Sequence, residues 1–215
     1  MHFQWHRVRN INRKNSILNN YSKGQAIFLQ GNQPFGMFCV HSGKIKILNV
    51  NNDGKESIVR LATGGDILGH RALFSNEAYN ASAITLEDSI ITFFSKEFIF
   101  NVIKEHPAIA LNIISLLSHT MGTAEIYSTT LVHKNVRERL AGLLFSLIRS
   151  YGIKEADRIR LDIRLTREEM AAMIGTTHET LVRLFTEFRN EEIIEQEGKI
   201  IFIINEKKLI EFAHV

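Results

Sequence analysis

Two oppositely charged residues lie four positions apart in the segment 177–189, where both would project from one side of a helix. Arg183 can donate two hydrogen bonds to guanine O6 and N7, and Glu179 can accept one from cytosine N4. A glutamate four residues before an arginine can also steady the guanidinium. His178 and Val182 belong to the same side. This combination predicts contact with base edges in the DNA major groove.

Hydroxyl groups flank this segment at positions suited to phosphate. Thr176, Thr177 and Thr180 fall at the predicted start of the helix, where free amides also favour an anion. Lys199 occupies a predicted turn between two apolar runs and can approach a phosphate backbone, although a solubilising turn residue would have the same sequence. With Thr166, these residues complete the predicted DNA-contact set.

A solvated ion pair would explain Glu179 and Arg183 equally well if they stood alone, but the surrounding residues favour a helix-turn-helix. Thr166 and Glu169 match a capping box, and Gly175 can end that first helix in a left-handed turn. Thr177 then caps a second helix. The apolar side of that helix has the spacing i, i+3, i+4 and i+7, at Leu181, Leu184, Phe185 and Phe188. The apolar runs around 193–204 predict an added wing.

A long helix is predicted over 107–133, with Pro107 in its first turn. Small and apolar residues repeat along it with a 3.5-residue period, which is typical of a parallel coiled-coil seam between two copies. The seam comprises Ala110, Ile114, Leu117, Met121, Ala124, Ser128 and Leu131. A second stripe, at Ile109, Ile113 and Leu116, can pack on the β-domain that precedes this helix. A core helix within one subunit is the alternative.

The region before this helix has short apolar runs punctuated by glycines, with a hairpin signal at Asp53-Gly54. This spacing predicts an antiparallel barrel or roll. The expected fold class is α+β, with an N-terminal antiparallel β-roll (jelly-roll), a long dimerisation helix and a C-terminal winged helix-turn-helix. The expected domains are 1–106, 107–134, which includes a hinge at 131–135, and 135–215. Ser95 and Asn135 are predicted to begin helices, and 157–163 to be a loop or edge strand.

The composition of the 215 residues is compatible with a polyanionic partner without requiring one, since the net charge is +3 and the pI about 9.0. The basic residues of the first segment are Arg7, Arg9, Arg13 and Lys14. The single cysteine, Cys39, excludes an intramolecular disulfide and is expected to be a buried strand residue. Neither a membrane-spanning run nor a secretory signal is recognisable, so we expect a soluble cytoplasmic protein without a membrane partner.

The string LTREEMAAMIGTTHETLVRLFTEFRNEEII, at 165–194, resembles the signature of the Crp/Fnr family of bacterial transcription regulators. GGDILGHRALFSNEAYNASAITLEDS, at 64–89, resembles the cyclic-nucleotide-type pocket of that family. The resemblance implies a sensor jelly-roll, a dimer helix, and a winged helix-turn-helix that binds palindromic double-stranded DNA as a homodimer. It also implies RNA polymerase as a partner and a small-molecule effector that re-poses the DNA helices. Glu179 and Arg183 match the base-reading positions of the family.

The effector pocket departs from the cyclic-AMP type. The positions that correspond to the pocket are Gly69, His70, Arg71, Ala72, Tyr79, Asn80, Ala124 and Glu125. His70 replaces the glutamate that holds the ribose, and Tyr79 replaces the arginine that pairs with the cyclic phosphate. Loss of such a charge-assisted bond costs roughly 1.5–3 kcal/mol. We therefore expect no tight cyclic-AMP binding; His70 with Arg71 can accept another anion, or the pocket is vestigial.

The sequence does not identify a cofactor. The cysteine set of the iron–sulfur sensors in the family is missing, and no metal site is predicted. The histidines that leave a haem-based gas sensor open are His2, His6, His41, His70, His119 and His133, and their spacing is not that of a metal site. The other alternative is a signalling module that contacts proteins rather than DNA, but only Val182 is apolar on the exposed helix side. An enzyme is not expected, because neither a nucleophile elbow nor a phosphate loop is recognisable.

Overall fold

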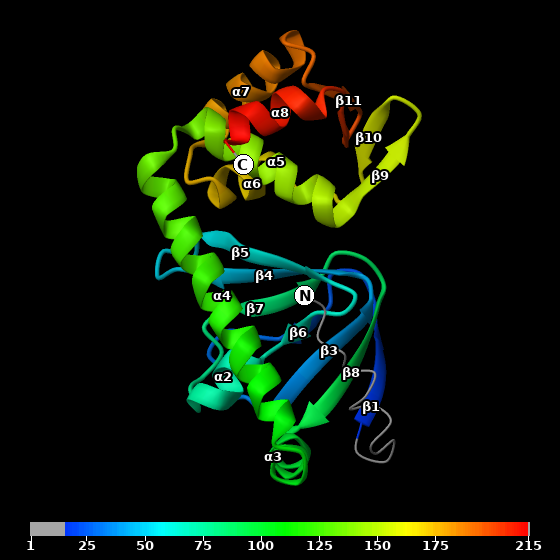
Figure 1. Cartoon of the computed structure of the whole chain (residues 1–215), viewed down its shortest axis with the longest axis vertical. Coiled ribbons are helices and arrows are strands. Elements are labelled where there is room, and N and C mark those ends of the chain that lie inside the picture. The colour runs from blue at the N-terminus through cyan, green and yellow to red at the C-terminus, as the bar shows by residue number, and fades with distance from the viewer. Residues whose placement is uncertain (1–15, 215) are drawn as a thin grey trace. The chain divides into compact units, whose positions relative to one another are not determined.

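The computed structural model describes residues 16–214, which divide into two compact units with the boundary between Thr123 and Ala124. The predicted α+β class is confirmed, with strands in both units and a long helix over 108–133 that contains the boundary between them in the sequence (Figure 1). The basic residues of the first segment and two of the histidines lie outside the described part of the chain, namely Arg7, Arg9, Arg13, Lys14, His2 and His6.

The first unit is built on two four-stranded antiparallel sheets, as the glycine-punctuated apolar runs predict. One sheet has the order β1 (Ser16–Tyr21), β8 (Ser89–Ser95), β3 (Gly36–Ser42) and β6 (Ile67–Leu68). The other has the order β2 (Ala26–Phe28), β7 (Ser82–Thr85), β4 (Lys44–Val50) and β5 (Glu56–Thr63). The predicted turn closes the β4–β5 hairpin, where Gly54 has a φ of 75°.

Apolar side chains from both sheets form the core of the roll. One cluster includes Val40, Ile45, Ala83 and Ile91, each at most 1% exposed. A second cluster joins the first sheet to helix α3 (Lys96–Glu105), which begins at the Ser95 cap as predicted. Cys39, on β3, is 6% exposed and belongs to this second cluster, so its thiol is buried. A short helix, α2 (His70–Ser75), was not predicted.

Helix α4 (Ala108–His133) begins directly after Pro107. The stripe at Ile109, Ile113 and Leu116 lies on the side of α4 that packs against the rest of the first unit. Ile113 is 4% exposed, and the other two residues pack on the second cluster. The seam residues lie on another side and are less covered; Ile114 is 57% exposed and Met121 65% exposed. A single chain thus buries one stripe and leaves the other open.

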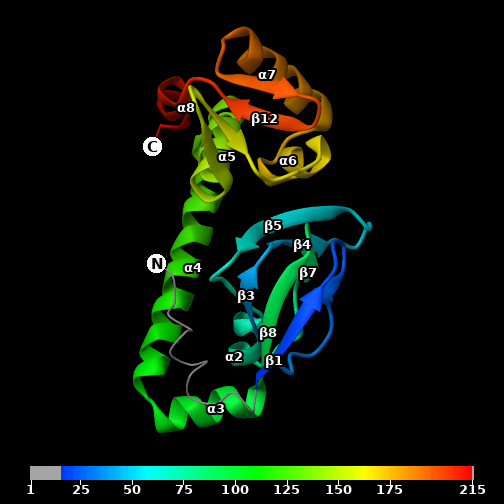
Figure 2. The same cartoon turned by 90° about the vertical axis from the view of Figure 1, so that its right-hand side faces the viewer.

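The second unit combines helices with a four-stranded antiparallel sheet (Figure 2). Its helices after α4 are α5 (Val136–Tyr151), α6 (Arg167–Met173), α7 (His178–Asn190) and α8 (Glu206–Ala213). The sheet has the order β11 (Ile194–Glu197), β12 (Ile200–Ile203), β10 (Arg158–Leu161) and β9 (Gly152–Glu155). Asn135 caps α5 as predicted. The segment 157–163 contributes β10, an inner strand of this sheet rather than a loop or edge strand, because β12 and β9 pair with its two sides.

Candidate nucleic-acid interface

Helices α6 and α7 form the predicted helix-turn-helix, and each begins at the predicted cap. The Thr166 hydroxyl accepts from the Glu169 amide at 3.1 Å, and the Glu169 carboxylate accepts from the Thr166 amide at 2.8 Å. Gly175 has a φ of 62° and turns the chain after α6. The Thr177 hydroxyl then accepts from the Thr180 amide at 3.3 Å and caps α7. Both helix starts are therefore fixed by side chains.

One side of α7 is buried and the other is exposed. Leu181, Leu184, Phe185 and Phe188 are all at most 5% exposed, which anchors the helix to its own unit. On the opposite side Val182 is 42% exposed, and the side chain of Arg183 is 70% exposed. His178 and Glu179 are exposed in the first turn. The buried side therefore holds α7 in the core of the unit, while the opposite side presents polar hydrogen-bonding groups to solvent.

The partner of Arg183 differs from the expected one. Its guanidinium lies 3.6 Å from the Glu187 carboxylate, one turn further along α7, and not against Glu179. Hydrogen bonds from its own backbone amide and from Thr177 lower the pKa of Glu179. The Glu179 carboxylate is thus held at the helix N-terminus, where amides favour a negative charge, and this competes with an ion pair to Arg183.

His178 bridges the two helices. Its Nε2 lies 3.2 Å from the Glu168 carboxylate on α6. The Glu168 pKa is lowered, first by its own backbone amide and the Thr166 hydroxyl, and further by His178. Both side chains are largely exposed, so this contact orients the imidazole without burying it.

The other predicted DNA-contact residues surround α7. Thr176 and Thr180 are half-buried, and Thr177 is exposed. Lys199 is exposed in the tight turn between β11 and β12, beside Gly198 with its φ of 60°. The wing and the start of α7 are thus accessible parts of the same compact unit.

Two arginines that hold this unit together were missed by the sequence analysis. Arg139, on α5, donates to the Ile174 carbonyl at 2.7 Å, to Lys134 at 2.6 Å and to Gly175 at 3.3 Å. Arg167 lies 3.7 Å from the centre of the Phe185 ring and donates to Gln196 at 2.6 Å. Neither role leaves a local signal, because all the partners except Lys134 are 18 to 36 residues away in the chain.

Among the expected effector residues, the structure brings Gly69 and Tyr79 together. Gly69 has a φ of 79°, and a Cβ there would lie 3.4 Å from the Tyr79 hydroxyl. The Tyr79 ring is buried and stacks on Phe28 with 4.1 Å between ring centres. Burial raises the pKa of Tyr79 to about 12, so the phenol is neutral at pH 7. An uncharged ring therefore occupies the position expected for the phosphate-binding arginine.

His70 is buried, with 7% of its surface exposed, and neither ring nitrogen has a hydrogen-bond partner in the described part of the chain. Burial lowers the pKa of His70 to about 4, and the charges of Arg60 and Arg71 act in the same direction. The Ile67 carbonyl opposes this shift without meeting the geometry of a hydrogen bond. The imidazole is therefore neutral at pH 7 and offers no charge to an anion.

The remaining expected effector residues are mostly on the surface. Arg71 and Asn80 are exposed, whereas Ala72 is buried in α2. Ala124 and Glu125 are exposed on α4. Within residues 16–214, no group of three or more His, Cys, Asp or Glu side chains is placed to hold a metal ion. The helices in this range also include none with the length and apolar character needed to cross a bilayer.

Comparison with known proteins assigns both units. Residues 18–106 match the model of the cyclic nucleotide-binding domain, and residues 138–212 match that of the Crp-like helix-turn-helix domain. The Fumarate and nitrate reduction regulatory protein of Vibrio cholerae is 28% identical over 95% of this chain and 80% of its own length. The Cyclic AMP receptor protein of Thermus thermophilus is 28% identical over 81% of this chain and 77% of its own. A CooA variant from Carboxydothermus hydrogenoformans superposes with a TM-score of 0.77 and 25% identity, covering 99% of this chain and 97% of CooA.

Proposed function

The chain belongs to the Crp/Fnr family of transcription regulators, and from this premise we propose that it binds two-fold palindromic promoter DNA as a homodimer. Regulators with a Crp-like helix-turn-helix bind DNA, and their family role is control of transcription rather than catalysis. We assign effector sensing to residues 1–106, dimerisation and the hinge to 107–134, and DNA binding to 135–215. The site of action is the cytoplasm, and RNA polymerase is the expected protein partner.

The observation that carries this proposal is the exposed side of α7. His178, Glu179, Val182 and Arg183 project from a helix whose opposite side is buried, so they can enter a major groove without unpacking the domain. Thr176, Thr177, Thr180 and Thr166 flank this side and contact phosphates in our proposal, together with Lys199 of the wing. Arg183 reads guanine through a bidentate contact, and Glu179 accepts from cytosine.

Dimerisation along α4 supplies the second half-site. The exposed seam that includes Ile114 and Met121 is apolar, and burying it against a second copy removes that surface from water. A two-fold axis along the seam duplicates α7, and a DNA palindrome with half-sites about 34 Å apart matches that symmetry.

The signal differs from cyclic AMP bound in the usual mode. A cyclic phosphate beside Tyr79 and His70 would meet two neutral rings, one of them in place of the arginine that pairs with the phosphate in the cyclic-AMP type. We propose that a different effector acts on the first unit.

The decisive experiment is selection of bound duplexes from a randomised DNA library, followed by titration of the enriched sequence. We expect a two-fold palindrome with an essential guanine in each half. Arg183→Ala should cost about 1–3 kcal/mol per half-site and relax selectivity for that guanine. Arg183→Lys should behave similarly, because an ammonium lacks the planar fork.

The matched control is Arg189→Ala, which removes an exposed arginine from the last turn of the same helix. This variant should retain the guanine preference. An equal loss for Arg183→Ala on the selected palindrome and on random DNA would contradict the base-reading role, because phosphate contacts alone weaken both alike.

A further inference from the structure

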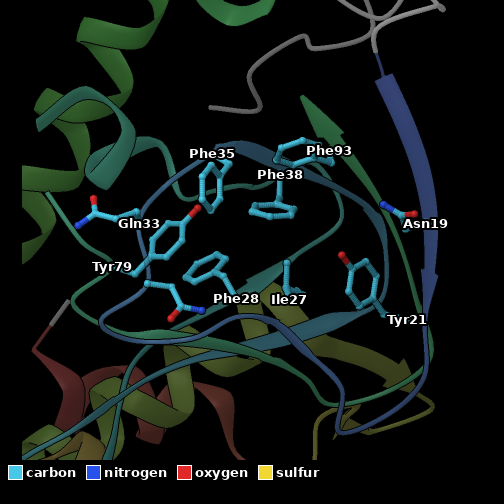
Figure 3. Close-up of a pocket in the computed structure, with 10 residues that line it drawn as sticks. Asn19, Tyr21, Ile27, Phe28, Gln33, Phe35, Phe38, Tyr79 and Phe93 are labelled. Atoms are coloured by element: carbon cyan, nitrogen blue, oxygen red, sulfur yellow. The ribbon is translucent and has the colours of Figure 1, made fainter. Parts of the chain in front are cut away.

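The β-roll contains a cavity with a volume of about 320 Å³, lined from β1, β2, β3, β8 and the segments that follow β2 and α2 (Figure 3). Six of its ten lining side chains are aromatic, namely Tyr21, Phe28, Phe35, Phe38, Tyr79 and Phe93. Of the residues that the sequence analysis assigned to an effector pocket, Tyr79 alone lines this cavity. The cavity is therefore distinct from the turn around Gly69 and His70.

The aromatic walls support one another. The Phe28 ring stacks on Tyr79 at 4.1 Å with 20° between the ring planes, and its centre lies 5.6 Å from that of Phe38. Phe38 in turn lies 5.1 Å from Phe93. The Phe28–Tyr79 pair is stacked, whereas Phe38 is tilted by 34° against Phe28 and by 49° against Phe93. These packed rings form a preformed aromatic wall, against which another aromatic ring can pack face-on or edge-on.

The lining selects against charge. Among residues 16–214, it contains no Asp, Glu, Lys, Arg or His side chain, and its polar groups are three amides and two phenols. An ion buried there would lose water without gaining a counter-ion, whereas a neutral molecule with one donor or acceptor can form a hydrogen bond with an amide or a phenol of the lining.

The mouth of the cavity exposes an aromatic ring to water. Phe35 lines the cavity and is 77% exposed, although it precedes the buried strand β3. In Figure 3 the Phe35 ring lies beside the hydroxyl end of the Tyr79 ring. A ligand in the cavity would cover this apolar face, which now contacts solvent.

We propose that this cavity binds a small uncharged aromatic molecule with one or two fused rings, of about the size of indole. The proposal deepens the effector step of the proposed function and rests on it for its regulatory meaning. The binding itself depends only on the ring-lined walls, the volume and the lack of charged side chains among the described lining residues.

Indole is a suitable probe, with indole-3-carboxylate and cyclic AMP as charged comparisons. The full-length protein is titrated by calorimetry, and the contacts are mapped by saturation-transfer NMR. We expect indole to bind with its ring protons saturated from the protein, and the carboxylate to bind at least roughly tenfold more weakly. Equal affinity for both indoles, or no binding of indole, would overturn the proposal.

Phe35→Ala locates the site without disturbing the core, because the ring is exposed in the free protein. It should weaken indole binding roughly tenfold by removing one stacking wall. The control is Leu29→Ala, which truncates a 49% exposed apolar residue of the same segment that does not line the cavity. Equal effects of the two substitutions would place the indole elsewhere and overturn the assignment.

DNA binding by the untreated protein is measured in parallel and separates the two proposals. A protein that binds its palindrome but not indole would refute the cavity assignment alone. A protein that binds indole in this cavity but no DNA would refute the proposed function and leave the ligand site in place.

Discussion

Val182 is the apolar residue among the exposed polar side chains at the start of α7, with 42% of its surface exposed. In a major groove its methyl groups would contact the 5-methyl group of thymine. We predict that replacing thymine by deoxyuridine at one half-site position weakens binding by about 1 kcal/mol, since one methyl contact is lost. Fluorescence anisotropy with the paired duplexes measures the difference.

Val182→Ala should abolish the discrimination between thymine and uracil, because the protein side of the contact is gone. Thr186→Ala, one turn further along α7, serves as the control and should keep it. If Val182→Ala still distinguishes thymine from uracil as well as the wild type does, another group contacts the thymine methyl.

His70 makes the stability of the first unit depend on pH. Its folded pKa of about 4 lies below the unfolded value of 6.5, so between these values the unfolded chain binds a proton that the folded ring does not. The free energy of unfolding is therefore highest above pH 6.5 and falls as the pH drops toward 4, by roughly 3 kcal/mol in total. Urea denaturation between about pH 4.5 and 7 measures the effect.

His70→Phe should remove this part of the pH dependence. It should cost little at pH 7, because neither ring nitrogen has a hydrogen bond to lose. His119→Phe, on the exposed surface of α4, is the comparison and should leave the profile intact. A wild-type slope that persists in His70→Phe would assign the pH dependence to other groups.

At the scale of elements, the turn between α6 and α7 and the turn of the wing provide a matched pair. Gly175 and Gly198 have φ angles of 62° and 60°, so alanine at either position is strained by about 1–2 kcal/mol. A Cβ on Gly175 would also lie 3.2 Å from the Leu131 side chain, whereas on Gly198 it meets nothing within 4 Å. Gly175→Ala should therefore lower the thermal midpoint of the second unit further than Gly198→Ala.

The double variant Gly175→Ala/Leu131→Ala tests the cause of the difference. Truncating Leu131, which is 37% exposed, should remove the contact and bring the effect of Gly175→Ala close to that of Gly198→Ala. If the two glycine variants are equally stable from the outset, the contact has no energetic weight.

The elements that the sequence predicted well are those with local signals. The caps Ser95, Asn135, Thr166 and Thr177 each accept from a backbone amide three residues later, so both partners lie within one turn of sequence. The strands with apolar runs were found for a similar reason, because their inward residues form the core of the roll.

The missed elements lack such signals. Strand β1 was not predicted because its apolar residues do not alternate with polar ones; Ile17 and Leu18 are adjacent, and both are exposed. Strand β6 has two residues, and β10 becomes an inner strand only through its pairing with β12, about 40 residues later. The aromatic cavity likewise joins residues from Asn19 to Phe93, which no local pattern connects.

At the scale of the whole molecule, substitutions at two exposed residues of α4 can distinguish a helix that dimerises along the seam from a helix that is exposed on all these sides. Met121 belongs to the seam and is 65% exposed, while Ile126 lies opposite the seam and is 69% exposed. Met121→Glu should weaken self-association by about 3 kcal/mol or more, over a hundredfold, because two carboxylates would be buried together. Sedimentation equilibrium measures this change.

Ile126→Glu is the control and should remain as dimeric as the wild type, because a charge there stays in water. The Met121→Glu variant should also lose affinity for a full palindrome but not for a single half-site. Monomers from both variants would point to a different interface.

The burial of Cys39 makes the assembly open to direct measurement. It is the single cysteine of the chain and lies inside the roll, 6% exposed, so thiol-specific reagents would spare it in the folded state. A Ser128→Cys substitution would then give each protomer one reactive handle on the seam. Spin labels attached there would report the spacing of the two long helices by double electron–electron resonance, with and without DNA, free of background from the native thiol.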